Sequence, residues 1–368
     1  MTAASHPPQS RVLFLTRRYP PSVGGIETHC YHLYTRLRQR TPVRLIALRR
    51  SSLVHLGWFL PRVFAGAALA LLRRQVDAVY FSDGVVASLA PVLRQLFPGR
   101  RFVTTIYGLE FTYPRPWARR LMVRGASSCD RVVVISRNTQ RLALDLGLSE
   151  VKLRIAYLGV EPTELPASVQ QELQQRFENR HGLHFGTQRI LFNFGRQIRR
   201  KGIVEFLQHG MPLLDPDIRL IIGGTGPQLA RIRQLAAGAQ LRDRVCVAGF
   251  LPDDELAMLR SCADLFIMPN IRVHGDVEGF GQTQLECMHA GTPAVAFAVD
   301  ALPESVREGG YLVPADDYRA FTGQIHAFFR LSPTERRAKE EEARAYVRRE
   351  YSWDNTAEQY LRVFAGTD

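Results

Sequence analysis

Short apolar runs alternate with stretches of helical spacing along the chain. The segment 11–16, RVLFLT, predicts a buried strand, and the apolar spacing within 24–40 predicts the helix that follows it. The same alternation continues to residue 160, with strands predicted at 43–48, 78–82, 101–106, 131–136 and 153–159. This pattern is typical of a parallel sheet whose strands are joined by helices.

A polar stretch with prolines near both ends, 160–171, interrupts the pattern and predicts a crossover between domains. After it the alternation restarts, with strands predicted at 189–195, 218–224, 244–250, 265–270, 293–298 and 310–314. We therefore expect an α/β protein with two doubly wound, Rossmann-like parallel-sheet domains, 1–160 and 161–352. Ligands of such sheets bind at the carboxyl ends of the strands, and two facing edges would form a cleft.

Composition agrees with two globular domains and gives little sign of export. The chain has 368 residues, 46% of them apolar, which suits two cores of ordinary size. The five cysteines are scattered and odd in number, which favours reduced thiols in a cytoplasmic protein. Residues 1–10 lack the pattern of a targeting peptide. The longest apolar run, 63–72, is too short to span a bilayer.

Basic residues are concentrated in the first half of the chain. Residues 1–160 contain 24 Lys and Arg against 7 Asp and Glu, whereas 161–368 contain 24 against 28. Such a field attracts anionic lipid headgroups, nucleic acid or a phosphorylated acceptor, although an arginine-rich solvated surface explains it too. Nucleic acid is disfavoured, because base-stacking motifs and known DNA-binding modules are absent.

Two segments of the first half combine aromatic, aliphatic and basic residues. They are 53–75, which includes Trp58 and Arg62, and 113–125, YPRPWARRLMVRG. Segments of this kind can lie on an anionic membrane and deliver a lipid-linked acceptor. They can equally be amphipathic helices that cover the sheet, and the pattern leaves both interpretations open.

Three loops that follow predicted strands have the composition of anion-binding loops. The first ends in Gly24-Gly25 before a helix, where bare amides can approach an anion. The second, FGRQIRRKG, contains Gly195, Arg196 and Lys201, whose two cations suit a diphosphate. The third, IIGGTGPQ, predicts a tight turn near a nucleotide, but it is too weak a match to indicate a nicotinamide cofactor.

The segment 274–293, HGDVEGFGQTQLECMHAGTP, places one glutamate before a predicted helix and a second within it. The helix should begin near Gly281 and end at Gly291. Glu278 then lies at its N-terminal mouth and Glu286 about five residues inside the helix. Backbone N–H groups between them can bind an anion, and they belong to Gly279, Phe280, Gly281 and Gln282. A sugar nucleotide has hydroxyls at both ends and phosphates between, so it fits this layout. The alternative is a structural role, with Glu286 paired to an arginine.

Taken together, these motifs resemble a retaining glycosyltransferase of family 4, which has the GT-B fold. The resemblance rests on the E-x7-E spacing in EGFGQTQLE, the loop GRQIRRKG, the early GGIE and the closing YSWDNTAEQYL, and it spans nearly the whole chain. It implies that the first domain binds the acceptor and the second the donor. It also implies that the terminal helix, within 353–368, packs back on the first domain.

The resemblance assigns a role to each motif. Arg196 and Lys201 would stabilise the departing diphosphate, Glu278 would hold the transferred sugar and Glu286 the ribose. Gly24 and Gly25 would approach the diphosphate from the first domain, while Phe250 and Leu251 would flank the base. The resemblance implies no cofactor and no metal ion. Preorganised cations and amides would stabilise the leaving group instead.

One position departs from the family pattern. Members usually carry a histidine that contacts the donor sugar after the strand corresponding to 101–106, and here Tyr107 occupies that position. A phenol can donate a hydrogen bond to a sugar, but it does not titrate near neutrality as imidazole does. We therefore count Tyr107 among the catalytic candidates. Glu110, Asp83 and Arg137 are further candidates for substrate contacts.

The favoured function is thus metal-independent, retaining transfer of a hexose from a nucleoside-diphosphate sugar to an acceptor hydroxyl. A lipid-linked acceptor or a cell-envelope glycan precursor would suit the basic first domain and a peripheral position on the inner face of the cell membrane. Two alternatives remain. One is a sugar-nucleotide-binding protein that Tyr107 has made inactive, and the other is a sugar-nucleotide epimerase on the same fold.

Overall fold

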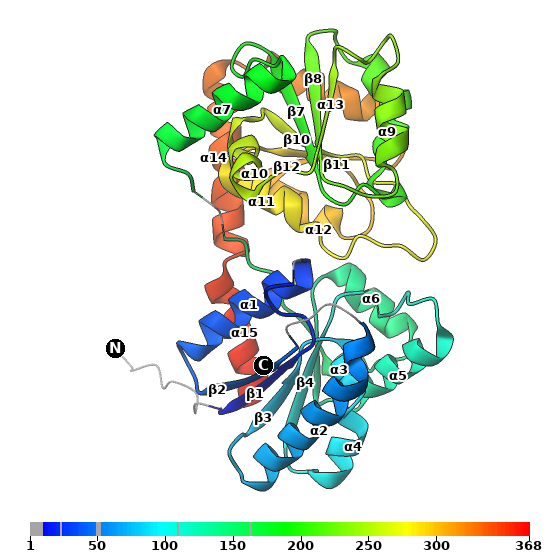
Figure 1. Cartoon of the computed structure of the whole chain (residues 1–368), viewed down its shortest axis with the longest axis vertical. Helices are drawn as coiled ribbons and strands as arrows, with labels where there is room; N and C mark the ends of the chain where they lie inside the picture. Colours follow the sequence, from blue (N-terminus) through cyan, green and yellow to red (C-terminus); the bar gives the residue numbers. More distant parts are fainter. Residues whose placement is uncertain (1–9, 23, 49–52, 109, 162–163) are drawn as a thin grey trace. The chain divides into compact units, whose positions relative to one another are not determined.

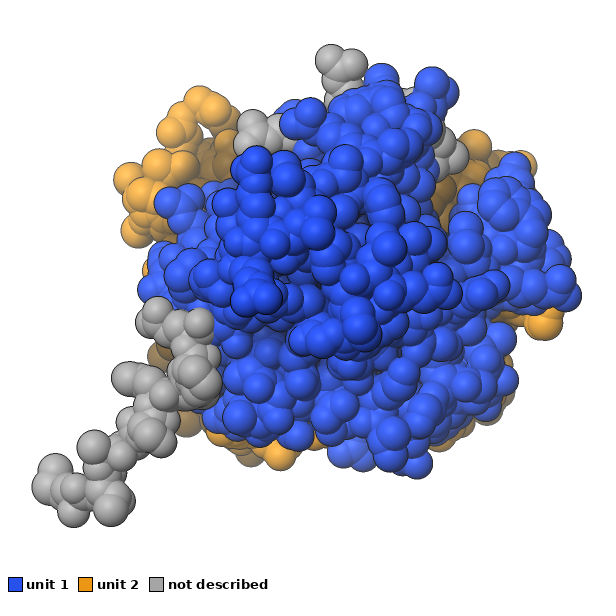
Figure 2. Space-filling model, turned by 90° about the horizontal axis from the view of Figure 1, so that it is seen from below, with its two compact units in different colours: residues 1–159, 351–368 blue, residues 160–350 orange. Residues whose placement is uncertain are grey.

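A computed structural model describes residues 10–368 except 23, 49–52, 109 and 162–163. The chain divides into two compact units (Figure 1; Figure 2 colours them separately). Unit 1 comprises residues 1–159 and 351–368, and unit 2 comprises residues 160–350. The predicted absence of a targeting peptide concerns residues that lie almost entirely outside the described part.

Unit 1 is built on a parallel sheet with the order β2-β1-β3-β4-β5-β6. Its strands are β1 Val12–Thr16, β2 Val43–Ala47, β3 Ala78–Phe81, β4 Arg101–Ile106, β5 Arg131–Val134 and β6 Leu153–Ile155. The order changes direction between β1 and β3, so the loops after these two strands flank the topological switch point. The predicted strand 153–159 proves shorter, because the chain leaves the sheet after Ile155 and Gly159 lies directly against Trp353.

Helices cover both faces of this sheet (Figure 1). They are α1 Gly25–Arg38, α2 Leu56–Leu72, α3 Gly84–Ala87, α4 Ala90–Leu96, α5 Pro116–Ser127, α6 Arg137–Asp145 and α15 Trp353–Ala365. Alternate strand residues point to opposite faces. Leu13 and Phe81 therefore pack with α2, α3 and α4, whereas Phe14 and Tyr80 pack with α1 and α15.

Helix α15 completes the second face of unit 1, although it comes from the end of the sequence. Tyr360 is fully buried in the core of unit 1, and its hydroxyl shares a 2.7 Å hydrogen bond with Thr105 of β4. Asp368 forms ion pairs with Arg101, Arg131 and Arg154, which lie on β4, β5 and β6. The helix predicted at the end of the chain thus has polar contacts with the sheet of unit 1 from its middle, through Tyr360, and from the residues just after it, through Asp368.

Unit 2 repeats the architecture with the strand order β12-β11-β10-β7-β8-β9, again all parallel. Its strands are β7 Arg189–Phe194, β8 Ile218–Gly223, β9 Val245–Gly249, β10 Leu265–Met268, β11 Ala294–Phe297 and β12 Gly310–Val313. The order reverses between β7 and β10, so the switch point lies between the loops that follow these strands. Two Rossmann-like sheets in tandem confirm the predicted fold class.

The helices of unit 2 are α7 Ala167–His181, α8 Ile203–His209, α9 Leu229–Ala236, α10 Asp253–Cys262, α11 Gln282–Ala290, α12 Leu302–Val306, α13 Tyr318–Arg330 and α14 Pro333–Glu350. Helices α8, α9 and α13 contribute Phe206, Ile232 and Phe321 to one core cluster with the strands. In Figure 1, α7, α10 and α11 lie on the other side of the sheet from α9 and α13.

The segments 53–75 and 113–125, for which the sequence allowed either a membrane-surface helix or a helix that covers the sheet, contain α2 and α5. Helix α2 buries Phe59 and Val63 in the core, yet Trp58 and Leu72 remain 51% and 68% exposed. On α5, Trp117 is 67% exposed. Each helix therefore covers the sheet and also presents large apolar side chains to solvent. Among the described residues, no helix combines the length and hydrophobicity that a membrane span requires.

Candidate active site

The two loops beside the switch point of unit 2 are fastened to each other through their backbones. The loop after β7 contains the 3₁₀ turn η3, Arg199–Lys201, and ends at Gly202. The N–H of Ile271, in the loop after β10, donates a 3.0 Å hydrogen bond to the carbonyl of Arg200. Gly202 has φ +65°, and a Cβ there would lie 1.8 Å from the carbonyl oxygen of Pro269. Only glycine permits this approach, which brings the two loops together.

Glu278 lies where the two loops meet and receives three polar contacts. Lys201 Nζ donates to Glu278 Oε2 over 2.6 Å, and Asn270 Nδ2 donates to the same oxygen over 3.0 Å. Arg200 forms a further ion pair with this oxygen. The side chains of Lys201 and Glu278 are only 9% and 10% exposed. Within the described residues every side-chain contact to Glu278 goes to Oε2, so Oε1 stays available to a ligand.

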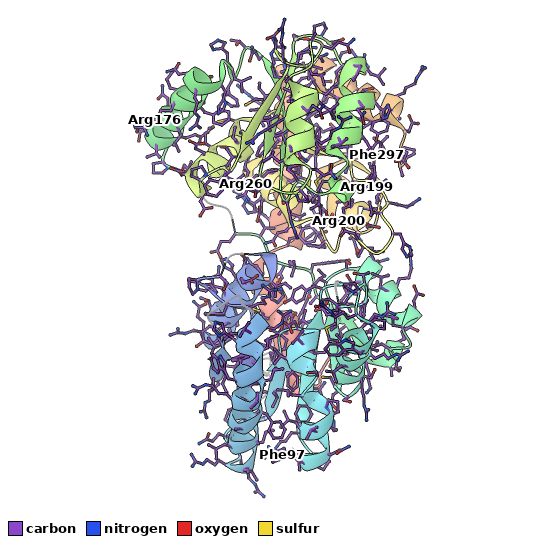
Figure 3. The ribbon with its side chains drawn as sticks, turned by 45° about the vertical axis from the view of Figure 1, so that its right-hand side comes forward. Phe97, Arg176, Arg199, Arg200, Arg260 and Phe297 are labelled. Carbon is purple, nitrogen blue, oxygen red and sulfur yellow. The ribbon has the colours of Figure 1, made fainter. Side chains whose placement is uncertain are left out.

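The charge of Glu278 is strongly stabilised. Burial by itself would raise the pKa of this carboxyl group, but the charges of Lys201 and Arg200 and the hydrogen bonds outweigh burial and lower the pKa to about 2. Glu278 is therefore an anion at any physiological pH. Figure 3 shows Arg200 and its neighbour Arg199 on the turn that carries these cations.

A second layer of contacts orients this cluster. Arg200 Nε donates to Asp276 Oδ1 over 2.9 Å, which fixes the guanidinium group beside Glu278. The backbone N–H of Glu278 donates to Asp300 Oδ2 over 2.8 Å. Asp300 itself has φ +51°, a left-handed conformation that aspartate tolerates better than most residues. Because these contacts are short and mostly buried, the carboxylate of Glu278 is held in one position.

Glycines form the neighbouring part of the strand edge. Gly195 has φ +147°, and a Cβ there would lie 3.7 Å from Cε of Lys201. Gly224 and Gly226 pack against the loop that holds Gly195, since added Cβ atoms would lie 2.0 Å from the Gly195 carbonyl oxygen and 2.4 Å from that of Gln197. The turn predicted from IIGGTGPQ therefore packs against the cationic loop, and its glycines are required for that packing.

The mouth of α11 has the geometry expected from its sequence. The helix begins at Gln282, and Gly281 precedes it in the left-handed conformation with φ +76°. Phe280 is buried and anchors the loop, while Gly279 is only half-buried. The amides predicted to bind an anion thus belong to the last loop residues and the first helical residue, next to Glu278 in the sequence.

Glu286 is engaged in an ion pair within unit 2. It lies on α11 and pairs with Arg260 of α10, which Figure 3 labels. Burial raises the pKa of Glu286, and Arg260 offsets only part of that effect. This contact is the arginine pair that the sequence left open as an alternative. The ribose-binding role of Glu286 stays a prediction.

The remaining donor-side candidates differ in exposure. Arg196 lies after Gly195 and is exposed. Phe250 is 76% exposed, whereas Leu251 is 5% exposed and lies against Gly223, where a Cβ would be 2.4 Å from Leu251 Cδ1. Leu251 therefore has a packing role in the strand edge. An exposed phenyl ring at the carboxyl end of β9 is free to stack on a planar group.

Unit 1 also has an ion pair at its switch point. Arg17, after β1, pairs over 2.9 Å with Asp83, after β3, and Asp83 Oδ1 also accepts the N–H groups of Val85 and Val86 at the start of α3. Asp83 is thus a helix cap as well as an ion-pair partner. Gly24 and Gly25 immediately precede and begin α1, with the side chain of Glu27 close to Gly24.

Tyr107 follows β4 at the same edge and is 6% exposed. Its hydroxyl is buried and has no hydrogen-bond partner in the described structure. Its ring meets the ring of His29, from α1, edge to face with 5.5 Å between the centroids. Burial lowers the pKa of His29 to about 3, with a smaller effect of His32, so this imidazole is neutral. A histidine is therefore adjacent to the position where the family histidine was expected.

In the described part of the chain, no group of three or more His, Cys, Asp or Glu side chains is arranged to hold a metal ion. All five cysteines are free, and Cys30, Cys129 and Cys287 are buried. Cys246 and Cys262 are only partly buried.

Comparison with known proteins places this geometry in a functional class. The family model Glycosyltransferase Family 4 matches residues 23–164, and the model Glycosyl transferases group 1 matches residues 174–345. The two matches fall on the two halves of the chain and together cover most of it. The chain is a glycosyltransferase with the GT-B fold.

Individual relatives of the glycosyltransferase agree. GDP-mannose-dependent α-(1-6)-phosphatidylinositol monomannoside mannosyltransferase of Mycolicibacterium smegmatis is 29% identical over 69% of this chain and 67% of its own. The Mycobacterium tuberculosis protein of the same name is 26% identical over 98% and 99%. The Anabaena protein Alr3699/HepE, solved in complex with UDP, superposes with a TM-score of 0.76 at 18% identity over 97% of this chain and 100% of its own.

The sequence missed several polar partners that hold Glu278 in this glycosyltransferase. Arg200 was one of several basic residues in its loop, and only the turn of η3 shows that it faces Glu278. Asn270 and Asp300 each follow a buried strand, β10 and β11, so their position at the carboxyl ends was the available signal. Asp276 offered no comparable signal, because it lies in the middle of a long loop.

Proposed function

We propose that this glycosyltransferase is a retaining, metal-independent hexosyltransferase that uses a nucleoside-diphosphate sugar. The observation that carries the proposal is the buried contact of Lys201 and Arg200 with Glu278 at the switch point of unit 2. Two cations beside a helix mouth can stabilise an anionic leaving group, and the oriented carboxylate can accept hydrogen bonds from a sugar. The two tasks need charges of opposite sign, and this site contains both.

The chemistry required of this site is charge stabilisation. As the bond between the anomeric carbon and the phosphate oxygen breaks, negative charge develops on the departing diphosphate. Lys201, Arg196 and the amides from Gly279 to Gln282 would stabilise that charge. Glu278 would bind hydroxyls of the sugar through Oε1, since its other oxygen is occupied by Lys201, Arg200 and Asn270.

Other residues of unit 2 are proposed to hold the nucleoside. Phe250 presents an exposed ring to the base beside the packed Leu251. Glu286 would bind the ribose diol, which requires that Arg260 leave part of the carboxylate accessible. The side chain of Glu286 is 23% exposed, so one of its edges can be reached by a ligand.

A thermal-shift panel of nucleoside-diphosphate sugars tests the donor and the metal requirement together. We expect one base and sugar combination to raise the melting temperature by several degrees at a concentration of about 100 Kd, with the same shift in EDTA. The Lys201→Met variant should lose the shift, while Lys339→Met, at an exposed lysine of α14, should keep it. If no donor stabilises the wild-type protein, or if EDTA abolishes the shift, the proposal is wrong.

Turnover distinguishes the transferase from the two alternatives. A transferase releases nucleoside diphosphate faster when acceptor is present, and the anomeric configuration of the sugar is retained in the product. An epimerase instead converts the donor without any acceptor. A protein that binds the donor but neither transfers nor hydrolyses it would be an inactive binding protein.

For the acceptor, we propose a lipid-linked molecule presented at an anionic membrane surface. Support comes from the exposed Trp58 and Trp117 in a strongly basic unit, and from the mycobacterial relatives, whose names specify a phosphatidylinositol mannoside. The protein should float with vesicles containing 30% phosphatidylglycerol at low salt and not with pure phosphatidylcholine vesicles. Replacing both tryptophans by serine should release it, and equal binding to both vesicle types would contradict the proposal.

A further inference from the structure

The carboxyl group of Glu286 is held at one oxygen and open at the other. Its Oε2 forms the ion pair with Nη2 of Arg260. Among the described residues, the structure shows no hydrogen bond or ion pair to Oε1, and Oε1 is not one of the buried polar atoms that lack a partner. Oε1 is therefore the oxygen that reaches the surface, in a side chain that is 23% exposed.

This carboxyl group lies on the face of α11 that begins at the helix mouth. Gln282 and Glu286 are four residues apart, so they share one face of the helix and are separated by about 6 Å along its axis. Side chains on a helix lean towards its N-terminus, which brings the carboxyl group nearer to the mouth. The spacing suits a ribose whose diphosphate meets the amides of the mouth.

Arg260 lies on a part of α10 whose backbone is anchored on two sides. The hydroxyl of Thr292, which follows α11, donates to the carbonyl of Arg260 over 2.7 Å and to that of Ala263 over 3.1 Å. Asp264, just after α10, accepts the backbone N–H of Ile190 in β7 over 2.7 Å. The end of α10 is thus tied to the sheet and to the segment after α11, so a rigid element presents Arg260 to Glu286.

Arg260 also opposes the electrostatic cost of burying Glu286. Burial raises the pKa of Glu286, whereas the charge and the hydrogen bond of Arg260 lower it. A glutamate side chain has three rotatable bonds, so a carboxyl group without this partner could turn Oε1 away from the surface. The ion pair therefore affects both the charge and the direction of the carboxyl group.

We propose that Arg260 is a positioning residue of the nucleoside subsite, which holds Oε2 of Glu286 so that Oε1 accepts a hydrogen bond from a ribose hydroxyl. Arg260 itself does not contact the nucleotide. A carboxylate can only accept hydrogen bonds, so a carboxylate in a fixed position selects for a sugar that carries the matching hydroxyl. The proposal rests on the proposed function, because it takes Glu286 as the ligand of the ribose.

The test separates this role from that of an ion pair that merely joins α10 to α11. A purely structural pair would affect the binding of every nucleotide alike. The probes are UDP, GDP and ADP, each with its 2′-deoxy and 3′-deoxy analogues. Isothermal titration calorimetry gives their Kd values for the wild type, Arg260→Met, Glu286→Gln and the double variant. The nucleotide that binds the wild type most tightly is compared with its two deoxy analogues.

We expect the loss of one ribose hydroxyl to raise the wild-type Kd by about 10- to 100-fold, as for other hydrogen bonds to a charged group. Arg260→Met should raise the Kd of the ribonucleotide by about 10-fold, but that of the sensitive deoxy analogue by less than about twofold. When Glu286 is already replaced by glutamine, Arg260→Met should change the ribonucleotide Kd by less than about twofold, because the two residues act through one contact.

Two further variants serve as controls. Arg180→Met removes another ion pair of α10, in which Arg180 is 51% exposed and meets Glu255 over 2.7 Å at the start of that helix. It should leave the Kd of the ribonucleotide and of its analogues unchanged. Arg260→Lys keeps a cation beside Glu286, so it should fold even if Arg260→Met does not, and it should raise the ribonucleotide Kd by about threefold. Melting temperatures show which variants are folded.

Three results would overturn the proposal. Equal losses for the ribonucleotide and both deoxy analogues in Arg260→Met would make the ion pair purely structural. An unchanged ribonucleotide Kd in that variant would mean that Glu286 needs no positioning. A wild-type protein that binds a nucleotide but does not distinguish it from either deoxy analogue would exclude Glu286 as the ribose ligand. Failure of the proposed function looks different, because the wild-type protein would then bind none of the three nucleotides.

Discussion

The glutamates at the two sheet edges, Glu278 in unit 2 and Glu110 in unit 1, are both almost fully buried, yet their environments are opposite. Glu278 receives Lys201 and Arg200, and its pKa falls to about 2. Glu110 receives no cation and lies near Asp83, and its pKa rises to about 7. The two sheets thus surround one buried carboxyl group with cations and the other with backbone N–H groups.

The difference shows what each edge can bind. In unit 2 the cations already present at the edge suit an anionic ligand, and the fixed carboxylate adds selectivity for hydroxyls. In unit 1 the carboxyl group of Glu110 accepts backbone N–H groups and has no cationic partner among the described residues.

The largest expected effect concerns the cation of unit 2. Lys201→Met removes the cation that we propose stabilises the departing diphosphate. The value of kcat/KM should therefore fall by about 10²- to 10³-fold, the usual cost of losing one transition-state contact. Steady-state nucleotide release measures this effect. Lys339→Met should retain wild-type activity, since Lys339 pairs with Glu342 on the exposed surface of α14. If kcat/KM of Lys201→Met falls by less than threefold, Lys201 does not stabilise the leaving group, and the proposed role of the cations at the edge of unit 2 is wrong.

Stability tests the compensated charge directly. Glu278→Gln breaks a buried ion pair and should lower the free energy of unfolding by about 3–5 kcal/mol at pH 7. Because the folded-state pKa of Glu278 is lowered, its stabilisation is complete above the unfolded-state value of about 4.5 and is lost as pH falls towards 2. Urea titrations at pH 7, 5 and 3.5 should show the deficit shrinking only at the lowest pH. If the difference in the free energy of unfolding between Glu278→Gln and the wild type is the same at all three pH values, the lowered pKa of Glu278 is wrong.

Glu110 should affect the pH dependence of stability in the opposite direction to Glu278. Its folded-state pKa is raised, so the native protein binds more protons than the unfolded chain between pH 4.5 and 7, and stability falls as pH rises through that window. Glu110→Gln removes this loss and should stabilise the protein by up to about 3 kcal/mol at pH 8, with little effect at pH 4.5. The groups that act on the Glu110 carboxyl are Asp83, which raises its pKa, and the backbone N–H groups of Tyr107, Gly84 and Glu110 itself, which lower it. Destabilisation at pH 8 would show that an unseen cation compensates Glu110.

The smallest effect is expected for the tyrosine hydroxyl. Tyr107→Phe removes a buried polar atom that has no partner, so the variant should be as stable as the wild type or more stable by about 1 kcal/mol, equivalent to a few degrees in melting temperature. Transfer should nevertheless be slower. A clear loss of stability would mean that the hydroxyl has a structural partner, such as an ordered water molecule.

The fold could be predicted largely from the sequence, since buried parallel strands are near-continuous apolar runs. Every predicted strand exists, and α11 begins and ends at the predicted glycines. The main error concerned 156–159, where the chain leaves the sheet to pack against Trp353. Apolar pattern alone cannot distinguish that contact from a strand, because the partner lies about 200 residues away in the sequence.

The site was predicted less completely. Lys201 and Glu278 were identified through their motifs and do meet, but Arg200 was not distinguished from the arginines around it. Which of these arginines faces Glu278 depends on the turn of η3 and on the close approach of Gly202 to Pro269. Both are features of the tertiary structure, so the sequence of the loop alone does not reveal them. The partner of Glu286 was likewise undecidable, because Arg260 lies on a different helix.

The placement of α15 has a consequence for biosynthesis. The strands β1, β3 and β4 are made first, but the helix that covers one of their faces is made only after all of unit 2. At 5–20 residues per second, the roughly 190 intervening residues take about ten to forty seconds to synthesise. For that time the apolar surface that Tyr360 and Phe364 will bury stays open on the nascent chain. Unit 2, which is continuous in sequence, can close while the ribosome is still completing its neighbour.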